Sequence, residues 1–197
     1  MEQLPVIIQG GMGVAVSGWR LARTVSRLGQ LGVVSGTGVD TVCVRRLQQG
    51  DVGGHVRRAL AAFPIPAMAR RFVERYFRPP GPERPFARLP LWTAEPDQAR
   101  QEVAILANFA EVWLAKEGHA GWVGINFLEK IQLPMLPSLF GALLAGVDYV
   151  LMGAGIPREI PGILDRLARY EEATMRLAVE GDAAGREVLL RFDPRPF

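Results

Sequence analysis

Four short, mainly apolar stretches of the chain predict strands, and the first and third of them are expected to be buried because the first has no polar alternation at all and the third is almost wholly apolar. These stretches are residues 6–8, 32–35, 122–127 and 147–152. The first strand, the helix expected after it and the second strand span about thirty residues, the usual size of a right-handed βαβ unit. The repeated strand–helix order predicts an α/β fold with a parallel sheet.

Helical spacing dominates the segments between these strands. Ser17 is a candidate N-cap, and Leu21, Val25 and Leu28 recur at intervals of four and three, which predicts a helix that buries this stripe. Further helices are expected in two or three pieces over residues 40–77, from Pro96 and Asp97 to about 118, over 139–145, and from Pro157 or Pro161 to about 170. Closely spaced prolines make residues 78–85 a loop.

Small residues follow three of the predicted strands, and an asparagine ends the fourth. The loops are residues 10–13, 36–38 and 153–155, and the asparagine is Asn126. In a parallel sheet these ends share one edge, where bare glycine backbone admits a flat heteroaromatic ring. Met12 could pack on such a ring and Asn126 could bond its N–H and C=O groups. The alternatives are a tight structural turn for the glycines and a local turn cap for Asn126.

Other ligand motifs are weaker. Residues 11–16 begin like a dinucleotide fingerprint, but Val16 stands where the third glycine belongs and no acidic residue ends the second strand. No phosphate P-loop sequence occurs. His55 and His119 have no metal-ligating neighbours at useful spacing, so we expect no metal site, and no catalytic triad can be argued.

Composition narrows the class of protein. Hydrophobic residues make up 49% and charged residues 22%, which is typical of a globular protein rather than a disordered one. The 21 arginines include six in residues 70–88, a basic segment that could meet an anionic substrate or partner or form a solvated face. We expect no nucleic-acid partner.

Cysteine use and hydropathy bear on location. Cys43 is the sole cysteine and cannot form an internal disulfide, which favours a reducing, cytoplasmic location. The apolar run over residues 139–150 is too short for a membrane span, so we expect no membrane partner.

Four segments together resemble the 2-nitropropane dioxygenase family. They are PVIIQGGMG (5–13), LGVVSGTG (31–38), VGIN (123–126) and YVLMGAGIP (149–157), and the resemblance covers most of residues 4–165. Members of this family are FMN-binding TIM barrels and include nitronate monooxygenases and flavin-dependent enoyl-ACP reductases. The resemblance implies one partial (β/α)8 domain over residues 1–197, with an arginine-rich helical insertion at about 40–118. A β-hairpin is expected at about 172–192, with Gly181 and Asp182 at its turn.

The resemblance also assigns roles to residues. The backbones of Gly10, Gly11 and Met12 would lie beside the flavin ring of FMN, Gly36 and Thr37 would line the same floor, Asn126 would bond the polar edge of the ring, and Gly153 and Ala154 would border the substrate side. Glu129 and Lys130 follow Asn126 and are candidates for the substrate pocket, although a surface ion pair between them is an alternative.

The chain departs from the family after its fourth strand–helix unit. A closed barrel has eight such units, and its phosphate site belongs to the loops after strands seven and eight. The histidine base of the family lies in a Gly-Gly-His segment that has no counterpart here, since neither His55 nor His119 matches, so the catalytic residue stays unassigned. We therefore expect a fragment, a truncated product, or a half-barrel that self-associates or pairs with a missing C-terminal half, and weak or absent flavin binding by one chain alone.

Three functions are compatible with these expectations. The first is oxidation of a small carbanion-like substrate, such as an alkyl nitronate, with FMN and molecular oxygen. The second is an NAD(P)H-dependent enoyl reductase on the same scaffold. The third is a half-barrel without catalytic activity.

Overall fold

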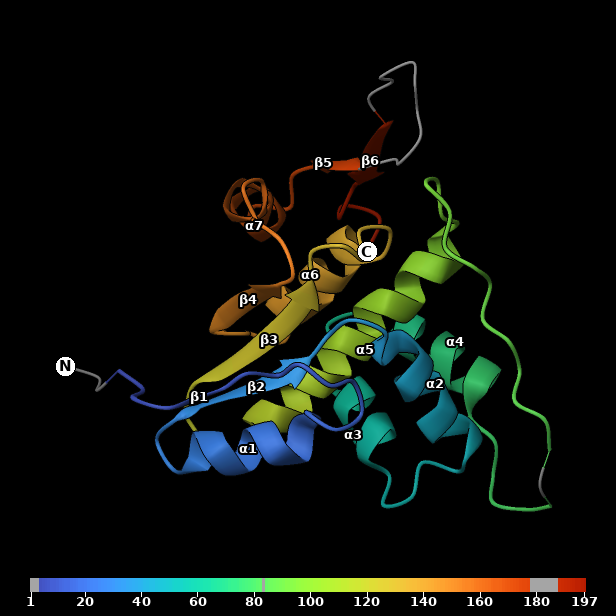
Figure 1. The fold of residues 1–197 in the computed structure, drawn as a ribbon. Helices are drawn as coiled ribbons and strands as arrows, with labels where there is room; N and C mark the ends of the chain where they lie inside the picture. Colours follow the sequence, from blue (N-terminus) through green and yellow to red (C-terminus); the bar gives the residue numbers. More distant parts are fainter. Residues whose placement is uncertain (1–3, 83, 178–187) are drawn as a thin grey trace.

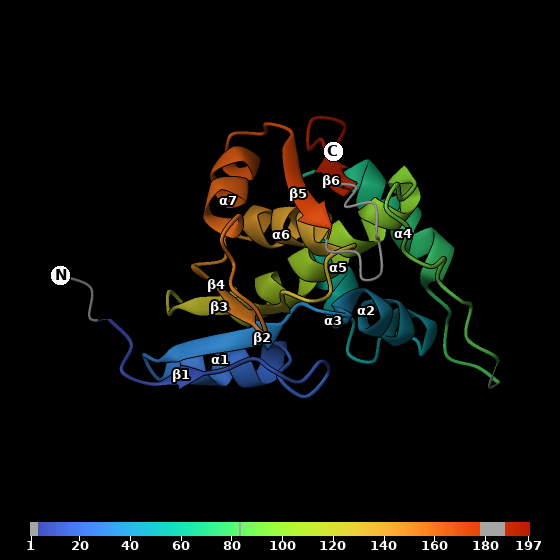
Figure 2. The same cartoon turned by 45° about the horizontal axis from the view of Figure 1, so that its top comes forward.

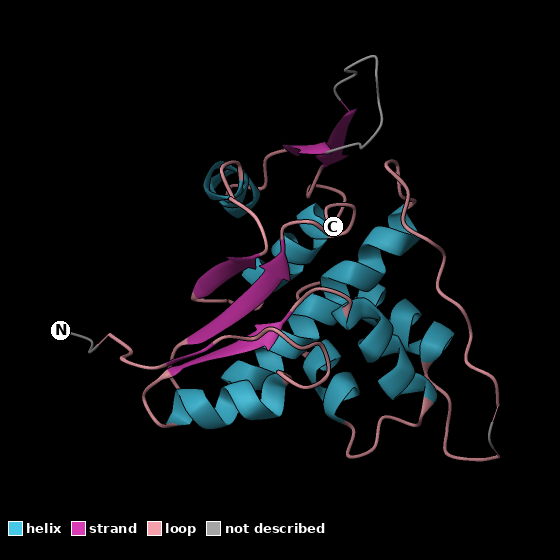
Figure 3. Ribbon diagram, in the orientation of Figure 1, coloured by secondary structure: helices cyan, strands magenta, loops and turns pink. Residues whose placement is uncertain are grey.

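Four parallel strands form the centre of the protein in a computed structural model that describes residues 4–82, 84–177 and 188–197 (Figure 1). Their spatial order follows the chain: β1 (Ile8–Gln9), β2 (Leu31–Ser35), β3 (Val123–Leu128) and β4 (Tyr149–Gly153). The sheet curls into a half-barrel with helices around it, which confirms the α/β class and the parallel sheet (Figure 3). Sequential order with right-handed crossovers places the connecting helices on one face of the sheet.

Seven helices lie in the described residues. They are α1 (Trp19–Arg27), α2 (Val39–Gln48), α3 (His55–Ala61), α4 (Pro66–Tyr76), α5 (Gln98–Lys116), α6 (Met135–Leu144) and α7 (Ile160–Ala168). Residues 40–77 thus form three helices, and 78–82 and 84–85 are loop, as predicted. The helix α5 begins where expected, because the Asp97 carboxylate accepts a hydrogen bond from the Arg100 N–H at 2.6 Å. Almost every side of α5 is buried, since α1, α2, α3 and α6 all pack against it.

The prediction of a fully buried first strand is wrong. Val6, Ile7 and Ile8 are 83%, 62% and 58% exposed, and only Ile8–Gln9 pairs with β2. The physical reason is that β1 is an edge strand: it has β2 on one side and no described strand on the other. An apolar run indicates only that a strand is suited to burial. Whether the strand is buried depends on the elements that pack against it.

The predicted buried stripe of α1 is also wrong. Its buried residues are Trp19, Ala22 and Ser26, while Leu28 is 74% exposed. The small residues face the sheet because α1 lies very close to β2: a Cβ atom on Gly32 would come within 1.9 Å of the Ala22 carbonyl oxygen. Ser17 does not cap this helix; the buried Glu111 carboxylate of α5 accepts the Trp19 N–H at 2.8 Å instead.

A short antiparallel pair, β5 (Ala173–Leu177) with β6 (Val188–Phe192), packs against α6 and α7 (Figure 2). The turn predicted at Gly181 and Asp182 lies outside the described residues. Within the described ranges, no helix is both long and apolar enough to cross a membrane. The same residues contain no cluster of histidine, cysteine, aspartate or glutamate suited to a metal ion.

Candidate functional site

The carboxyl ends of β1 to β4 form one edge of the half-barrel, here called the rim: residues 10–13, 36–38, 126–129 and 153–155. Strand register brings them together, because Ser35 pairs with Asn126 and Leu128 pairs with Gly153. Side chains alternate along β3. Ile125 and Phe127 enter the helix-covered core, so Asn126 faces the opposite, concave side of the sheet.

Met12, Asn126 and Gly153 meet at the centre of the rim. A Cβ atom on Gly153 would lie 3.5 Å from the Met12 Cε and 3.7 Å from the Asn126 Oδ1. The Asn126 residue is buried, yet its carboxamide makes no hydrogen bond to any described residue. The rim therefore places the Met12 thioether and the free Asn126 amide around the backbone of Gly153. The thioether can pack on the face of a ring, and the amide can bond its polar edge.

The packing of the chain explains some of the rim glycines. At Gly36 a Cβ atom would come within 2.3 Å of the Phe127 ring, and at Gly11 within 2.5 Å of the Val33 side chain, where φ is also +67°. These two glycines satisfy the fold itself. At Gly10 and Gly153 an added Cβ would meet nothing closer than 3.8 Å and 3.5 Å, which is ordinary contact. Their lack of a side chain is not required by the protein's own packing.

Thr37 and Ala154 complete the set of residues expected beside a flavin. The Thr37 Oγ1 accepts a hydrogen bond from the Leu128 N–H at 2.9 Å. This bond connects the ends of β2 and β3, so the Thr37 hydroxyl has a structural role. Ala154 is exposed and has a φ of 57°, in the left-handed region that costs a residue with a Cβ some strain. All eight residues expected to contact the cofactor thus belong to the rim, although Thr37 and two of the glycines also serve the fold.

Of the two substrate-pocket candidates, Glu129 lines a cavity and Lys130 does not. The Glu129 N–H bonds the Gly153 carbonyl at 2.9 Å, and its carboxylate lies over Gly155, where a Cβ atom would be 2.3 Å from Oε2. Glu129 also lines a cavity of about 270 Å³ with Met135, Met152, Ile156 and Met175. Lys130 is exposed, does not line this cavity, and forms no ion pair with Glu129. Sequence reasoning missed the three methionines, which come from α6, β4 and β5.

Neither histidine is among the rim residues. His55 begins α3 and its ring packs 4.9 Å from that of Trp19. Desolvation, reinforced by Arg20 and Arg58, lowers the pKa of His55. His119 follows α5 at the opposite end of β3, where its Nε2 donates to the Ala115 carbonyl and its Nδ1 accepts the Gly121 N–H. The rim residues themselves therefore include no histidine, and no catalytic base is assigned.

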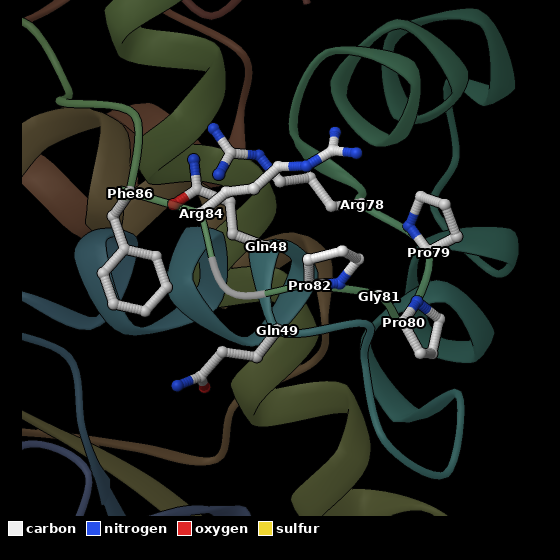
Figure 4. A pocket seen from close by; sticks show the side chains of 9 residues that line it. All are labelled: Gln48, Gln49, Arg78, Pro79, Pro80, Gly81, Pro82, Arg84 and Phe86. Atoms are coloured by element: carbon white, nitrogen blue, oxygen red, sulfur yellow. The ribbon is translucent and has the colours of Figure 1, made fainter.

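A larger cavity, about 480 Å³, is lined by the proline- and arginine-containing loop that begins at Arg78 (Figure 4). Gln48, the last residue of α2, and Gln49 after it form one wall of the cavity. The side chains of Arg78 and Arg84, which also line it, lie beside each other. It sits at the C-terminal end of α2, whereas the rim residues Gly36 and Thr37 precede the other end. A ten-residue helix is about 15 Å long, so this cavity is separate from the rim.

Comparison with protein-family models, curated proteins and solved structures gives no match for this chain. The resemblance to the 2-nitropropane dioxygenase family therefore rests on the four sequence motifs alone and stays a prediction.

Proposed function

We propose that the rim binds the isoalloxazine ring of FMN and that the chain supplies half of a (β/α)8 oxidoreductase of nitronate monooxygenase type. The convergence of Met12 and the free Asn126 amide on Gly153 carries this proposal. The bound flavin would supply the redox chemistry. The chain would orient the ring through Asn126, cover it with Met12, and admit it over Gly10 and Gly153.

The rim fits the ring of FMN better than its phosphate. The α2 N-terminus comes directly after the rim loop 36–38, but the Asp40 carboxylate in its first turn accepts the Thr41 N–H at 2.7 Å and pairs with Arg100, so it occupies a backbone donor that a phosphate would need. In closed barrels the phosphate is held by loops after strands seven and eight, beyond a four-stranded sheet. Because one chain would hold the ring but lacks the loops that hold the phosphate, we expect it to bind flavin weakly on its own. Glu129 and its methionine-lined cavity border the side on which a small substrate would lie.

Titration of the protein with FMN tests the proposal, and the quenching of flavin fluorescence reports the fraction of FMN bound. Asn126→Leu keeps the size of a side chain that has no protein partner, so the fold should persist while affinity falls about fivefold to thirtyfold, the value of one or two neutral hydrogen bonds. Gly153→Val should reduce affinity further by filling the ring's place. Leu91→Ala, at an exposed loop residue, is the control and should bind as the unchanged protein does.

Equal FMN affinity for the unchanged protein, Asn126→Leu and Gly153→Val would overturn the site. So would an absence of binding at every protein concentration, which would favour a half-barrel without catalytic activity. If FMN binds, the reaction is assigned by two assays. Nitronate-dependent oxygen uptake supports the monooxygenase, and NADH consumption with an enoyl thioester supports the reductase instead.

A further inference from the structure

Both outer strands of the sheet have a free edge among the described residues. In β1, the Ile7 carbonyl accepts the Leu31 N–H at 3.1 Å, so the pairing with β2 involves residues 7 and 9 and the peptide groups of Ile8 point away from β2. On the other side, β4 pairs with β3 alone. The β5–β6 pair packs on α6 and α7 and adds no strand to this sheet.

These edges lack the features that usually keep a free strand from pairing. Residues 4–16 and 149–156 contain no Lys, Arg, Asp or Glu, although arginine is abundant elsewhere. Natural proteins protect a free edge with charges, above all lysine. Exposed apolar side chains lie along β1 and the loop after it instead, at Val6, Ile7, Ile8 and Met12, and the exposed Ile156 follows β4.

The concave face of the sheet is also unfinished. By register, Ile8 lies on the same face as Leu31, and Leu151 on the same face as Asn126, opposite the helix-covered core. In a closed (β/α)8 barrel, residues on this face from all eight strands fill the interior in layers. Four strands supply half of those layers.

We infer that two copies of this chain close one eight-stranded parallel barrel, with β1 of each copy paired to β4 of the other. A two-fold axis along the barrel axis keeps all strands parallel and forms both seams at once, so no free edge remains. A second copy is the occupant that the observations favour, because it offers an uncharged, apolar edge of the matching kind to each of the two free edges. The inference does not depend on the proposed function.

The experiment measures the molar mass of the full chain by size-exclusion chromatography with light scattering. We expect about twice the 21.6 kDa of one chain. Ile8→Lys and Leu151→Glu each place one charge in both seams and should each give a monomer with unchanged circular dichroism. The matched controls Val52→Lys and Leu91→Glu change loop residues that are 82% and 89% exposed, and they should leave the dimer intact.

Mixing the two charged variants gives the decisive result. A heterodimer of Ile8→Lys with Leu151→Glu has one seam with opposite charges and one unchanged seam, so the mixture should recover the dimer mass. Recovery should weaken at high salt, which screens the charge pair. Val6→Lys, at an 83% exposed residue, replaces Ile8→Lys if that variant fails to fold.

A monomer for the unchanged chain would overturn the inference and leave the edges to further strands of a longer protein or to a different partner. A series of larger oligomers would overturn the closed barrel, because it shows open-ended edge pairing. Dimers that survive both charged substitutions would place the interface elsewhere. Variants that stay monomeric when mixed would contradict the two-seam arrangement.

Discussion

Gly36 lies against the ring of Phe127, so close that a Cβ atom at residue 36 would come within 2.3 Å of the ring carbon Cε1. Phe127 is itself buried in the core behind β3. The contact fixes the β2–α2 turn against the end of the neighbouring strand, at the same place where the Thr37 hydroxyl bonds the Leu128 N–H. The rim is therefore built on packing that exists without any ligand.

Gly36→Ala should destabilise the protein, because the buried Phe127 ring has to move to admit a methyl group. We expect a loss of about 1–3 kcal/mol in the free energy of unfolding, the usual cost of overpacking a core. Urea denaturation measures it. Gly10→Ala is the matched control, since an added Cβ there meets only the Met12 Cγ at 3.8 Å. Equal stability of the two variants would contradict this account of the turn.

Glu111→Gln should also destabilise the fold. The buried carboxylate accepts the Trp19 N–H at the start of α1 and pairs with Arg46 of α2, so it joins three helices. Removing its charge leaves Arg46 without a carboxylate, and we expect a loss of about 2–3 kcal/mol, reduced from the full cost of a broken buried pair because Arg46 is partly exposed.

Glu102→Gln, on the same helix, is the control for Glu111→Gln. Glu102 pairs with the well-exposed Arg71, and exposed ion pairs contribute at most about 1 kcal/mol. Thermal unfolding of both variants measures the difference. A loss at Glu102 as large as that at Glu111 would show that the helix, rather than the buried junction, is the sensitive feature.

The stability of the protein should fall as the pH drops through the normal titration range of histidine. The pKa of His55 is lowered in the folded state by desolvation and by Arg20 and Arg58, so the unfolded chain binds a proton more readily. The stabilisation is complete above the unfolded pKa of about 6.5 and is lost as the pH falls towards the folded pKa. Measuring unfolding between these limits in His55→Gln should show a flatter pH dependence. An unchanged slope would exclude His55 as the source.

If the barrel closes as a dimer, the two rims meet at one mouth and FMN should bind once for every two chains. The strands of both copies run in the same direction, so their carboxyl ends lie at the same end of the barrel. Flavin absorbance measured against molar mass gives the ratio. One flavin bound to each chain would show two independent sites. It would contradict the shared mouth without excluding the dimer.

The sequence predicts the strands and the rim well because both depend on local patterns. The strands β2 and β3 begin and end within about one residue of their predicted bounds, and the small residues at their ends lie together because parallel strands share an edge. The insertion helices and the approximate start of α5 are likewise local, since prolines and Asp97 mark their limits, although Asp97 is the cap of α5 rather than part of its first turn.

Burial was harder to predict because it depends on partners far along the chain. In α1 two stripes compete, Leu21 with Val25 and Leu28, and Trp19 with Ala22 and Ser26. The second is buried because the bare Gly32 lets the sheet approach small residues closely. The cavity beside Glu129 could not be found from spacing, since its methionines come from three separate elements.

The four-stranded arrangement has a genetic consequence. If two copies complete one barrel mouth, a single gene encodes both of its halves. A substitution at Asn126 or Gly153 then alters the mouth at two opposite points. A flavin is not symmetric, so one copy of such a residue would touch its pyrimidine ring while the other met a different part of the same molecule. Selection on either role would then constrain both.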